Sequence, residues 1–371
     1  MSRLHTGKPD FFFIAILVSL TFAGFFIFIS ASLGLLARGG ALFGTAVLKQ
    51  LLLGITLGSG CSLAAAYIPY KRWRTYAPWL FLAALALAAL VFVPGIGFEH
   101  GGARRWIALG PLSFQPAEFL KFALVLYAAA WLAALRERGR ETPFGMLPVF
   151  LILAAAAVLL IAQPNTSTLV VSIAAVAGMC IVAGARVRDL AALGAVAAAG
   201  IVVLVILRPY LYERIQTFLD PSRDALGASY QIQQSLIAVG SGGVFGRGFG
   251  QSVQKFEYLP EPMGDSIFAV AAEEFGFVGA LVLIVFFLTL AMLGFRIAAR
   301  APDIFGALLV TGFVVLIVSQ SFMNIGAMLG VIPLTGTPLI FVSKGGTALL
   351  FALAEAGIII NISRYQRVTR A

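Results

Sequence analysis

The sequence predicts an all-α polytopic membrane protein with about ten transmembrane helices, organised as a single integral membrane domain over residues 1–371. Hydrophobic residues make up 60% of the chain and charged residues only 11%, whereas a soluble domain carries about 25% charged residues. The hydrophobic residues are gathered into runs close to the roughly 20 residues that cross a bilayer. Basic residues recur in every second connection between these runs, as in membrane proteins of defined orientation.

Ten apolar runs along the chain are candidates for transmembrane helices. The first lacks a convincing cleavage signal, so we expect a retained membrane anchor and not a removed signal peptide. Cys61 and Cys180 each lie inside an apolar run, which favours helix packing over a disulfide or a metal site. The runs cover residues 11–36, 51–70, 75–95, 116–135, 146–163, 168–185, 190–207, 266–294, 304–323 and 347–363.

The positions of the basic residues predict that both termini are cytoplasmic. The two termini and every second connection hold 15 of the 26 Lys and Arg residues, and such residues are enriched in cytoplasmic loops. Membrane topology therefore accounts for most of the net charge of +10, and no nucleic-acid partner is needed to explain it. These residues are Arg3, Lys8, Lys71, Arg72, Arg74, Arg136, Arg138, Arg140, Arg186, Arg188, Arg296, Arg300, Arg364, Arg367 and Arg370.

One connection, residues 208–265, is much longer than the others and falls on the extracytoplasmic side. A loop of this length in a compact protein is usually functional or disordered. Residues 229–239 (SYQIQQSLIAV) predict an amphipathic helix within it. Six of the residues 240–250 are Gly, which suits a chain that turns close to a ligand or to another backbone.

The end of this loop and the start of the next run are rich in carboxylates. The chain has 16 acidic residues, and five of them are Glu257, Glu261, Asp265, Glu273 and Glu274. Asp265 is expected to cap the following helix or to serve function, because it shares a helix face with a stripe of small residues and would point along a packed surface. Glu273 and Glu274, about 12 Å deeper along the helix, are expected to form structural hydrogen bonds or to ligate a metal ion.

Charged residues also stand at the extracytoplasmic ends of other runs. Arg104 and Arg105 lie on an outer loop, against the charge rule, which favours anion binding. Glu118 and Lys121 are three residues apart on one helix face. They can form a structural ion pair at the membrane edge or take part directly in substrate binding.

Two further motifs contain polar residues. The stretch QPNTST at 163–168 predicts a tight polar turn between two runs. Lys344 stands beside Gly345 and Gly346 at the start of the last run, where it can snorkel toward water or bind phosphate together with exposed backbone N–H groups. Glu355 is buried further along the same run.

Four stretches follow one another in the order of a known family: GARRWIALGPLSFQPAEFLKF, the loop from FLDP through YQIQQSLIAVGSGG to GQSVQK, LPEPMGDSIFAVAAEEFGFVG and PLTGTPLIFVSKGGTALL. With these motifs the chain resembles the SEDS family of polytopic peptidoglycan polymerases, which includes FtsW and RodA. NISRY and EEFG favour the FtsW branch. The resemblance implies that Asp265 is essential for glycan polymerisation and that a class B penicillin-binding protein, a transpeptidase, is the partner.

Three positions depart from the family pattern. Asn165 replaces the usual aspartate after Gln-Pro, Met263-Gly264 replaces His-Thr before the essential aspartate, and Lys344 replaces an aromatic residue before the double glycine. The essential aspartate, Asp265, is kept.

The resemblance names the substrate as lipid II, a disaccharide-pentapeptide on undecaprenyl pyrophosphate, polymerised outside the bacterial cytoplasmic membrane at the division septum. We expect Asp265 to act as general base while the pyrophosphate leaves from the opposite face of the sugar. Positive charge for the leaving group would come from Arg104, Arg105, Lys344, Lys255 or a bound divalent ion, Mg or Mn. Other division or elongation membrane proteins are expected partners.

Two other functions remain open from the sequence. A flippase that moves lipid II across the membrane requires a continuous polar path to the cytoplasmic side, whereas the polar groups concentrate outside. A non-catalytic scaffold for division proteins would not need Asp265.

Overall fold

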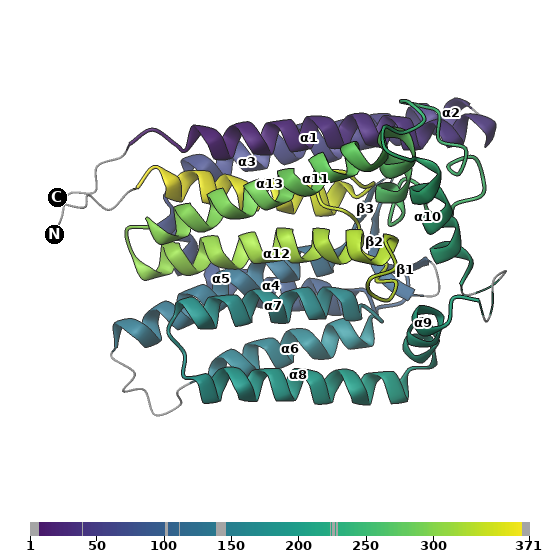
Figure 1. Cartoon of the computed structure of the whole chain (residues 1–371). Coiled ribbons are helices and arrows are strands. Elements are labelled where there is room, and N and C mark those ends of the chain that lie inside the picture. The colour runs from purple at the N-terminus through teal and green to yellow at the C-terminus, as the bar shows by residue number, and fades with distance from the viewer. Residues whose placement is uncertain are drawn as a thin grey trace.

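The computed structural model describes residues 7–365, apart from residues 39, 101–102, 111, 139–145, 223, 225–226 and 228. Arg3, Arg140, Arg367 and Arg370, which contributed to the topology prediction, lie outside the described residues. The described part of the chain is a bundle of long helices, with a small sheet and two short helices at one end (Figure 1).

Apolar helical segments occupy all ten predicted runs. Eight of them are long and apolar enough to cross a membrane, and α6 and α7 are shorter apolar helices. The all-α polytopic membrane fold is therefore confirmed, while the number of spans stays a prediction. The segments are α1 (Phe11–Ser32) with η1 (Leu33–Arg38), α2 (Gly40–Lys49) with η2 (Gln50–Leu57) and α3 (Gly58–Tyr67), α4 (Tyr70–Leu90), α5 (Pro116–Glu137), α6 (Leu147–Ala162), α7 (Thr166–Val182), α8 (Val187–Leu207), α11 (Ile267–Ala299), α12 (Ile304–Met328) and α13 (Gly346–Ser363).

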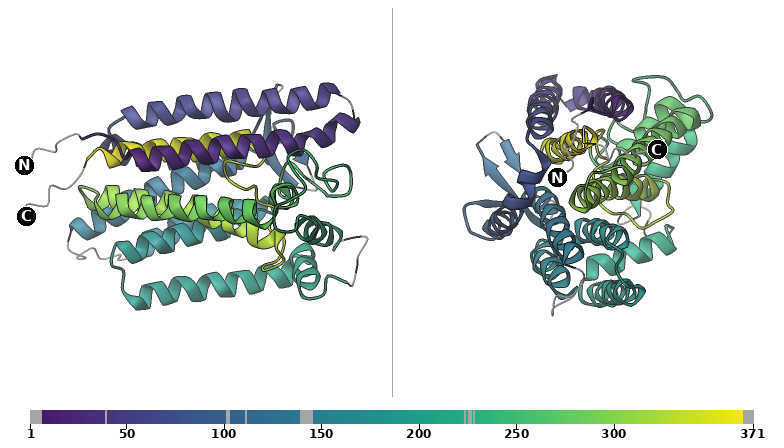
Figure 2. Two further views of the ribbon diagram at one scale, coloured as in Figure 1. Left: turned by 45° about the horizontal axis from the view of Figure 1, so that its top comes forward. Right: turned by 90° about the vertical axis from the view of Figure 1, so that its left-hand side faces the viewer.

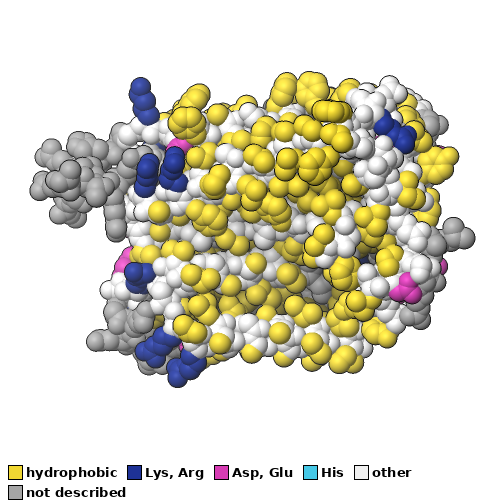
Figure 3. Space-filling view, viewed as in Figure 1, with side chains coloured by type: hydrophobic (Ala, Val, Ile, Leu, Met, Phe, Trp, Pro, Cys, Tyr) yellow, Lys and Arg dark blue, Asp and Glu magenta, His cyan; other side chains and the backbone are white. Residues whose placement is uncertain are grey.

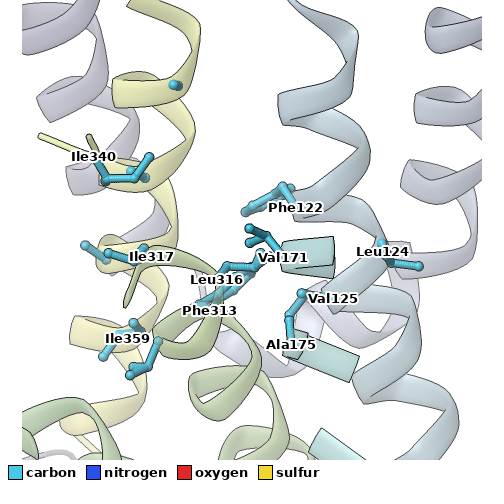
Figure 4. Close-up of a cluster of buried hydrophobic side chains, with 14 of the residues drawn as sticks. Phe122, Leu124, Val125, Val171, Ala175, Phe313, Leu316, Ile317, Ile340 and Ile359 are labelled. Carbon is cyan, nitrogen blue, oxygen red and sulfur yellow. The ribbon is translucent and has the colours of Figure 1, made fainter. Parts of the chain in front are cut away.

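Helices α5, α7 and α12 form the centre of the bundle. Phe122 of α5 stacks on Phe313 of α12 with 5.4 Å between ring centroids, and Val125, Val171 and Ala175 fill the space between α5 and α7 (Figure 4). A helix that is apolar all round is stable either in the core of a protein or against the hydrocarbon of a bilayer. Accordingly, 72% of the apolar window of α12 is buried, against 6% of that of α8, which lies at the edge of the bundle.

The two ends of the bundle differ in charge. The backbone N–H of Asp10 donates to Ser363 Oγ at 3.0 Å, which brings the start of α1 to the end of α13. Lys and Arg side chains gather at this end, and hydrophobic side chains cover the flank between the ends (Figure 3). We call this the basic end, and the opposite end, which carries the sheet and the short helices, the loop end.

The elements of the loop end were only partly predicted. The helix expected at 229–239 is confirmed as α10 (Tyr230–Ser241), whereas α9 (Pro209–Leu219) was not expected. Strands β1 (Gly97–His100), β2 (Ala103–Leu109) and β3 (Leu112–Phe114) form an antiparallel sheet in the order β1-β2-β3, also not expected. The sheet lies at the side of the bundle next to α4 (Figure 2).

Helix α11 is interrupted at Gly276, where φ is +66°. The glycine-rich loop after α10 forms hydrogen bonds with backbone groups of α11 on both sides of this interruption. Arg247 N–H donates to Glu273 O at 3.0 Å, and Phe277 N–H donates to Gly243 O at 2.9 Å. Backbone groups freed by a kink need such partners when they are buried. The predicted close approach of the glycine cluster to another backbone is therefore confirmed, and a side chain at Gly276 would collide with Gly246.

Candidate active site

A cavity of about 510 Å³ opens at the loop end, and Asp265 lies in its wall. The wall combines residues of β2, α9 and α10 with Pro164 before α7, Asp265 before α11 and the connection between α12 and α13, so segments far apart in sequence meet there. The polar side chains that line it are those of Arg105, Tyr210, Glu213, Arg214, Thr217, Gln231 and Asp265.

The backbone around Asp265 is held by short hydrogen bonds. Asn324 of α12, only 1% exposed, donates from Nδ2 to the carbonyl oxygen of Asp265 at 2.7 Å and to that of Thr337 at 2.7 Å. Ser343 Oγ donates to Gly264 O at 2.7 Å. A buried amide with two such bonds fixes the position of the loop from which the carboxylate projects.

The side chain of Asp265 faces the cavity. Helix α11 begins at Ile267 with Ser266 in the N-cap position, so the structure does not support the capping alternative for Asp265. Gly336, at φ +65°, lies between this carboxylate and the side chain of Arg214. A Cβ added there would be 3.6 Å from Asp265 Oδ2 and 3.4 Å from Arg214 Nη2. The glycine therefore keeps space open between an anion and a cation.

The surroundings raise the pKa of Asp265 from its ordinary 3.8 to about 6. Burial is the largest cause, because it disfavours the charged form, and the negative charge of Glu261 acts in the same direction. The positive charges of Arg214 and Arg105 act against them. A carboxyl group with this pKa is mostly ionised at neutral pH and is still basic enough to accept a proton.

The structure separates the two adjacent arginines that were predicted to serve one anion. Successive side chains of a strand point to opposite faces. Arg105 lines the cavity and is held there by bonds from Nε to Gln163 O at 3.0 Å and from Nη2 to Pro164 O. Arg104, with 53% of its side chain exposed, pairs with Glu99 at 3.6 Å. Of these two arginines, therefore, Arg105 alone lines the cavity together with Asp265.

Glu118 and Lys121 form a buried ion pair on α5, with 2.9 Å between Lys121 Nζ and Glu118 Oε2. Lys121 Nζ also donates to Gln320 Oε1 of α12 at 2.6 Å, and Glu355 of α13 interacts electrostatically with both charges. Neither Glu118 nor Lys121 lines the cavity. Their geometry matches the structural ion pair, which joins three helices in the bundle core.

Lys255 is not available to a leaving group, contrary to the prediction. It is 2% exposed, and its Nζ donates to Glu274 Oε1 at 2.7 Å and to Ser30 Oγ at 3.1 Å. Glu273 accepts from Ser252 Oγ at 2.6 Å and from Val253 N–H at 3.1 Å. Glu273 and Glu274 thus form structural hydrogen bonds, as one alternative predicted, and these bonds occupy the oxygens that a metal ion would need.

Lys344 and Asn165 are not among the residues that line the cavity. The backbone N–H of Lys344 donates to Met263 O at 2.7 Å, and its side chain is exposed but does not line the cavity. Gly345 N–H donates to Gln50 Oε1 at 3.5 Å, so this N–H is engaged within the protein. Asn165 is 6% exposed and follows Pro164, which lines the cavity.

Arg214, Asn324 and Gln231 were missed by sequence reasoning. Arg214 is a basic residue on the long outer loop, so the departure from the charge rule that singled out Arg104 and Arg105 applies to it equally. Gln231 Nε2 donates to Ser266 Oγ at 3.1 Å, next to Asp265. Gln231 lies in the family stretch YQIQQ, which could have indicated it, whereas nothing in the sequence pattern distinguishes Asn324 from other buried amides.

Metal ligands are sparse around this cavity. The described residues contain no group of three or more His, Cys, Asp or Glu that could hold a metal ion. Two carboxylates, those of Glu213 and Asp265, line the cavity.

Comparison with known proteins places the chain in a family. Residues 10–368 match the family model FtsW/RodA/SpoVE, described as cell cycle protein. The chain is 40% identical over 300 residues to stage V sporulation protein E of Bacillus subtilis (strain 168), with 81% of this chain and 82% of the relative covered. It is 37% identical over 360 residues to the probable peptidoglycan glycosyltransferase FtsW of Trichlorobacter lovleyi, with 96% and 93% covered.

Solved structures agree with this result. One of them is a chain from a peptidoglycan synthase complex that coordinates polymerization and crosslinking. It is 29% identical to this chain with a TM-score of 0.79, and the match covers 97% of this chain and 99% of the other. The rod shape determining protein RodA of Thermus thermophilus is 26% identical, with a TM-score of 0.70 and coverage of 97% and 98%. The chain therefore belongs to the FtsW, RodA and SpoVE family of cell cycle proteins, the SEDS family that its motifs resemble.

Proposed function

We propose that this protein is a peptidoglycan glycosyltransferase that polymerises lipid II into glycan strands, with Asp265 as the general base. The names of the FtsW relatives and the likeness to a peptidoglycan synthase complex support the reaction class. The observation that carries the assignment of Asp265 is its position in the wall of the 510 Å³ cavity, with Arg105 and Arg214 in the same wall.

The chemistry follows from these three side chains. Asp265 accepts the proton of the acceptor hydroxyl as that oxygen bonds to the anomeric carbon of the donor sugar. The bond from this carbon to the diphosphate breaks on the opposite face, so the configuration inverts. Arg105 and Arg214 stabilise the negative charge of the departing diphosphate, as guanidinium groups do with phosphate oxygens. A divalent ion bound with the substrate would be a further source of positive charge for the diphosphate.

The experiment that tests this function compares two carboxylate variants. The purified protein, together with its transpeptidase partner, is incubated with lipid II in detergent, and the glycan strands are measured. Detergent contains no bilayer across which a flippase could move lipid II. Asp265→Asn should lower the rate by a factor of about 10² to 10⁴. The control Glu261→Gln removes an exposed carboxylate from the same turn and should retain activity. Full activity of a folded Asp265→Asn protein would favour the scaffold or the flippase.

The partner and the cellular site belong to the same proposal. A class B penicillin-binding protein is the proposed partner, since the structural relative comes from a complex that couples polymerization to crosslinking. Together with other division or elongation proteins, it would act at the septum if this chain serves division, as the FtsW relatives suggest. Co-purification of the transpeptidase and fluorescence localisation of the tagged chain test these two points.

The reaction also requires the loop end to lie outside the cytoplasm. The charge difference between the two ends supports this orientation. A cysteine at exposed Ser222, in the loop between α9 and α10, should react with an impermeant maleimide from outside. A cysteine at exposed Arg138, at the end of α5, should react only after the membrane is opened. The opposite labelling pattern would place Asp265 on the wrong side for this function.

A further inference from the structure

A buried glutamine lies in an unusual turn of the second apolar segment. Residues of η2 (Gln50–Leu57) are π-helical and lie between the regular helices α2 and α3. π-Helical turns are rare and occur frequently at functional sites. Gln50 is the first residue of this turn and is 5% exposed, although the preceding Lys49 is exposed. A polar side chain buried in an apolar segment needs hydrogen-bond partners, and these partners indicate its role.

The partners of Gln50 are backbone groups of the connection between α12 and α13. Its Nε2 donates to Ser343 O at 3.2 Å, and its Oε1 accepts from Gly345 N–H at 3.5 Å. One side chain thus holds this connection on both sides of Lys344. The two bonds are long and therefore of modest strength, so their main effect is to fix the position of the connection at two points.

The connection that Gln50 holds is also bonded to the residues just before Asp265. Ser343 Oγ donates to Gly264 O at 2.7 Å, and the N–H of the next residue donates to Met263 O at 2.7 Å. The glutamine, residues 343–345 and residues 263–264 therefore form one continuous set of hydrogen bonds. This set ends at the residue next to the carboxylate.

The backbone of the same connection is strained at Phe341. This residue is 3% exposed and has a φ of +68°, a conformation that bulky residues rarely adopt. Such strain persists only where surrounding contacts determine the backbone, and it gathers at functional sites. Gly24 of α1 supplies one of these contacts, because a Cβ added there would collide with Phe341 O. Ser343 Oγ supplies another, since it accepts from Leu339 N–H at 2.8 Å.

We propose that Gln50 is a positioning residue for polymerisation, which holds the strained turn at residues 339–345 and through it fixes the backbone before Asp265. The inference rests on the proposed function and deepens it. Gln50 does not line the cavity, so it acts only through the backbone between them. Without the glutamine the strained turn can relax and displace residues 263–264. A displacement of about 1 Å at a reacting group lowers a rate by up to about 10².

The first test compares two variants that lose matched hydrogen bonds. Gln50→Met keeps the approximate volume of the side chain and removes both bonds. Asn361→Leu does the same at the basic end, where Asn361 donates to Ala66 O at 2.6 Å and accepts from Tyr70 N–H at 3.0 Å. Each of the two amides therefore bonds one backbone carbonyl and one backbone N–H, at opposite ends of the bundle.

The two variants should differ in kcat and not in stability. Measured with the transpeptidase partner, Gln50→Met should lower kcat by a factor of about 10 to 10² and leave the KM for lipid II within about twofold, because the glutamine does not touch the substrate. Asn361→Leu should lower the Tm to a similar extent and leave kcat unchanged. Equal effects on kcat, or an effect of Gln50→Met on KM alone, would overturn the proposal. If Gln50→Met does not fold, Gln50→Asn, which is one methylene shorter, is measured with the same expectation.

A double variant separates positioning from a general loss of stability. Ser343→Ala removes the bond to Gly264 O, which belongs to the same set of hydrogen bonds. Residues that act through one network are not additive. The loss of kcat in the protein with both Gln50→Met and Ser343→Ala should therefore be smaller than the product of the two single losses. Losses that multiply would contradict a shared path to Asp265.

Hydrogen–deuterium exchange of the purified complex tests the positioning without turnover. In the Gln50→Met protein, the backbone amides of residues 260–268 and 339–346 should exchange faster than in the parent, because exchange reports local opening. Asn361→Leu should leave exchange in both segments unchanged. Unchanged exchange in Gln50→Met, or faster exchange confined to residues 339–346, would refute the path to Asp265.

The two proposals can fail separately. Faster exchange of both segments in a Gln50→Met protein whose parent makes no glycan would uphold the hold of Gln50 on the backbone before Asp265 and refute the polymerase. An active polymerase whose kcat and exchange are insensitive to Gln50→Met would uphold the function and refute the role of Gln50.

Discussion

The pH dependence of polymerisation tests the role of Asp265 most directly. The pKa of this carboxyl group is raised to about 6, and the group lies two residues before the membrane-spanning α11. A general base acts in its ionised form, so activity should rise with pH through this value. The ionised fraction is about one half at pH 6, about one tenth at pH 5 and about nine tenths at pH 7. The value of kcat/KM at pH 5 should therefore be about one tenth of its plateau.

Neighbouring charges provide variants that move this profile in opposite directions. Arg214→Gln removes a positive charge that lowers the pKa of Asp265, so its profile should shift to higher pH. Glu261→Gln removes a negative charge that raises this pKa, so its profile should shift to lower pH. Arg104→Gln is the control, because Arg104 is exposed and pairs with Glu99 outside the cavity, and it should leave the profile in place.

The ionisation of Asp265 should affect folding stability and activity in opposite directions as the pH rises. Because the pKa of Asp265 is higher in the folded protein, folding stability falls as pH rises from about 4 to about 6. Asp265→Asn removes this unfavourable ionisation, so its Tm at pH 7 should equal or exceed that of the parent while activity is lost.

The pH–activity profiles are measured by glycan synthesis from lipid II between pH 5 and 8, by the complex of the protein with its transpeptidase. A flat profile, or shifts of Arg214→Gln and Glu261→Gln in one direction, would refute the reasoning.

Three further predictions concern other contacts. Arg105→Ala should weaken polymerisation, whereas Arg104→Ala should leave it near normal, and equal losses in the glycan assay would show that both are general surface charges. Lys255→Met should lower the free energy of unfolding by about 3–5 kcal/mol, because it leaves Glu274 buried without its cation. Adding Glu274→Leu should recover part of this loss, as measured by Tm in detergent. Asn324→Asp removes both donors that hold Asp265 and Thr337 and should lower kcat by up to about 10². Asn361→Asp, a buried amide at the basic end, should leave kcat of the folded protein unchanged.

The sequence by itself determined the membrane class, the ten apolar segments and the family. These properties depend on local quantities: the length of an apolar run, the sign of the charge beside it and the residues of a motif. The sequence also indicated Asp265 as a functional residue, because an ionisable group at the edge of a bilayer is energetically costly and is usually functional. Glycines after α10 indicated a close backbone approach, which the hydrogen bonds of this loop to α11 around Gly276 confirm.

Only the tertiary structure decided which charged residues meet Asp265. Arg104 and Arg105 are neighbours in sequence, but they lie on a short strand that was not predicted. Because successive side chains of a strand point to opposite faces, Arg105 lines the cavity and Arg104 lies at the surface. The residues that line the cavity with Asp265 are all further from it in sequence than Lys255 is, but Lys255 is buried against Glu274. Arg214 comes from a helix more than a hundred residues before the carbonyl that holds it. Distances between such groups depend on how helices from the whole chain pack, and no local pattern encodes that packing.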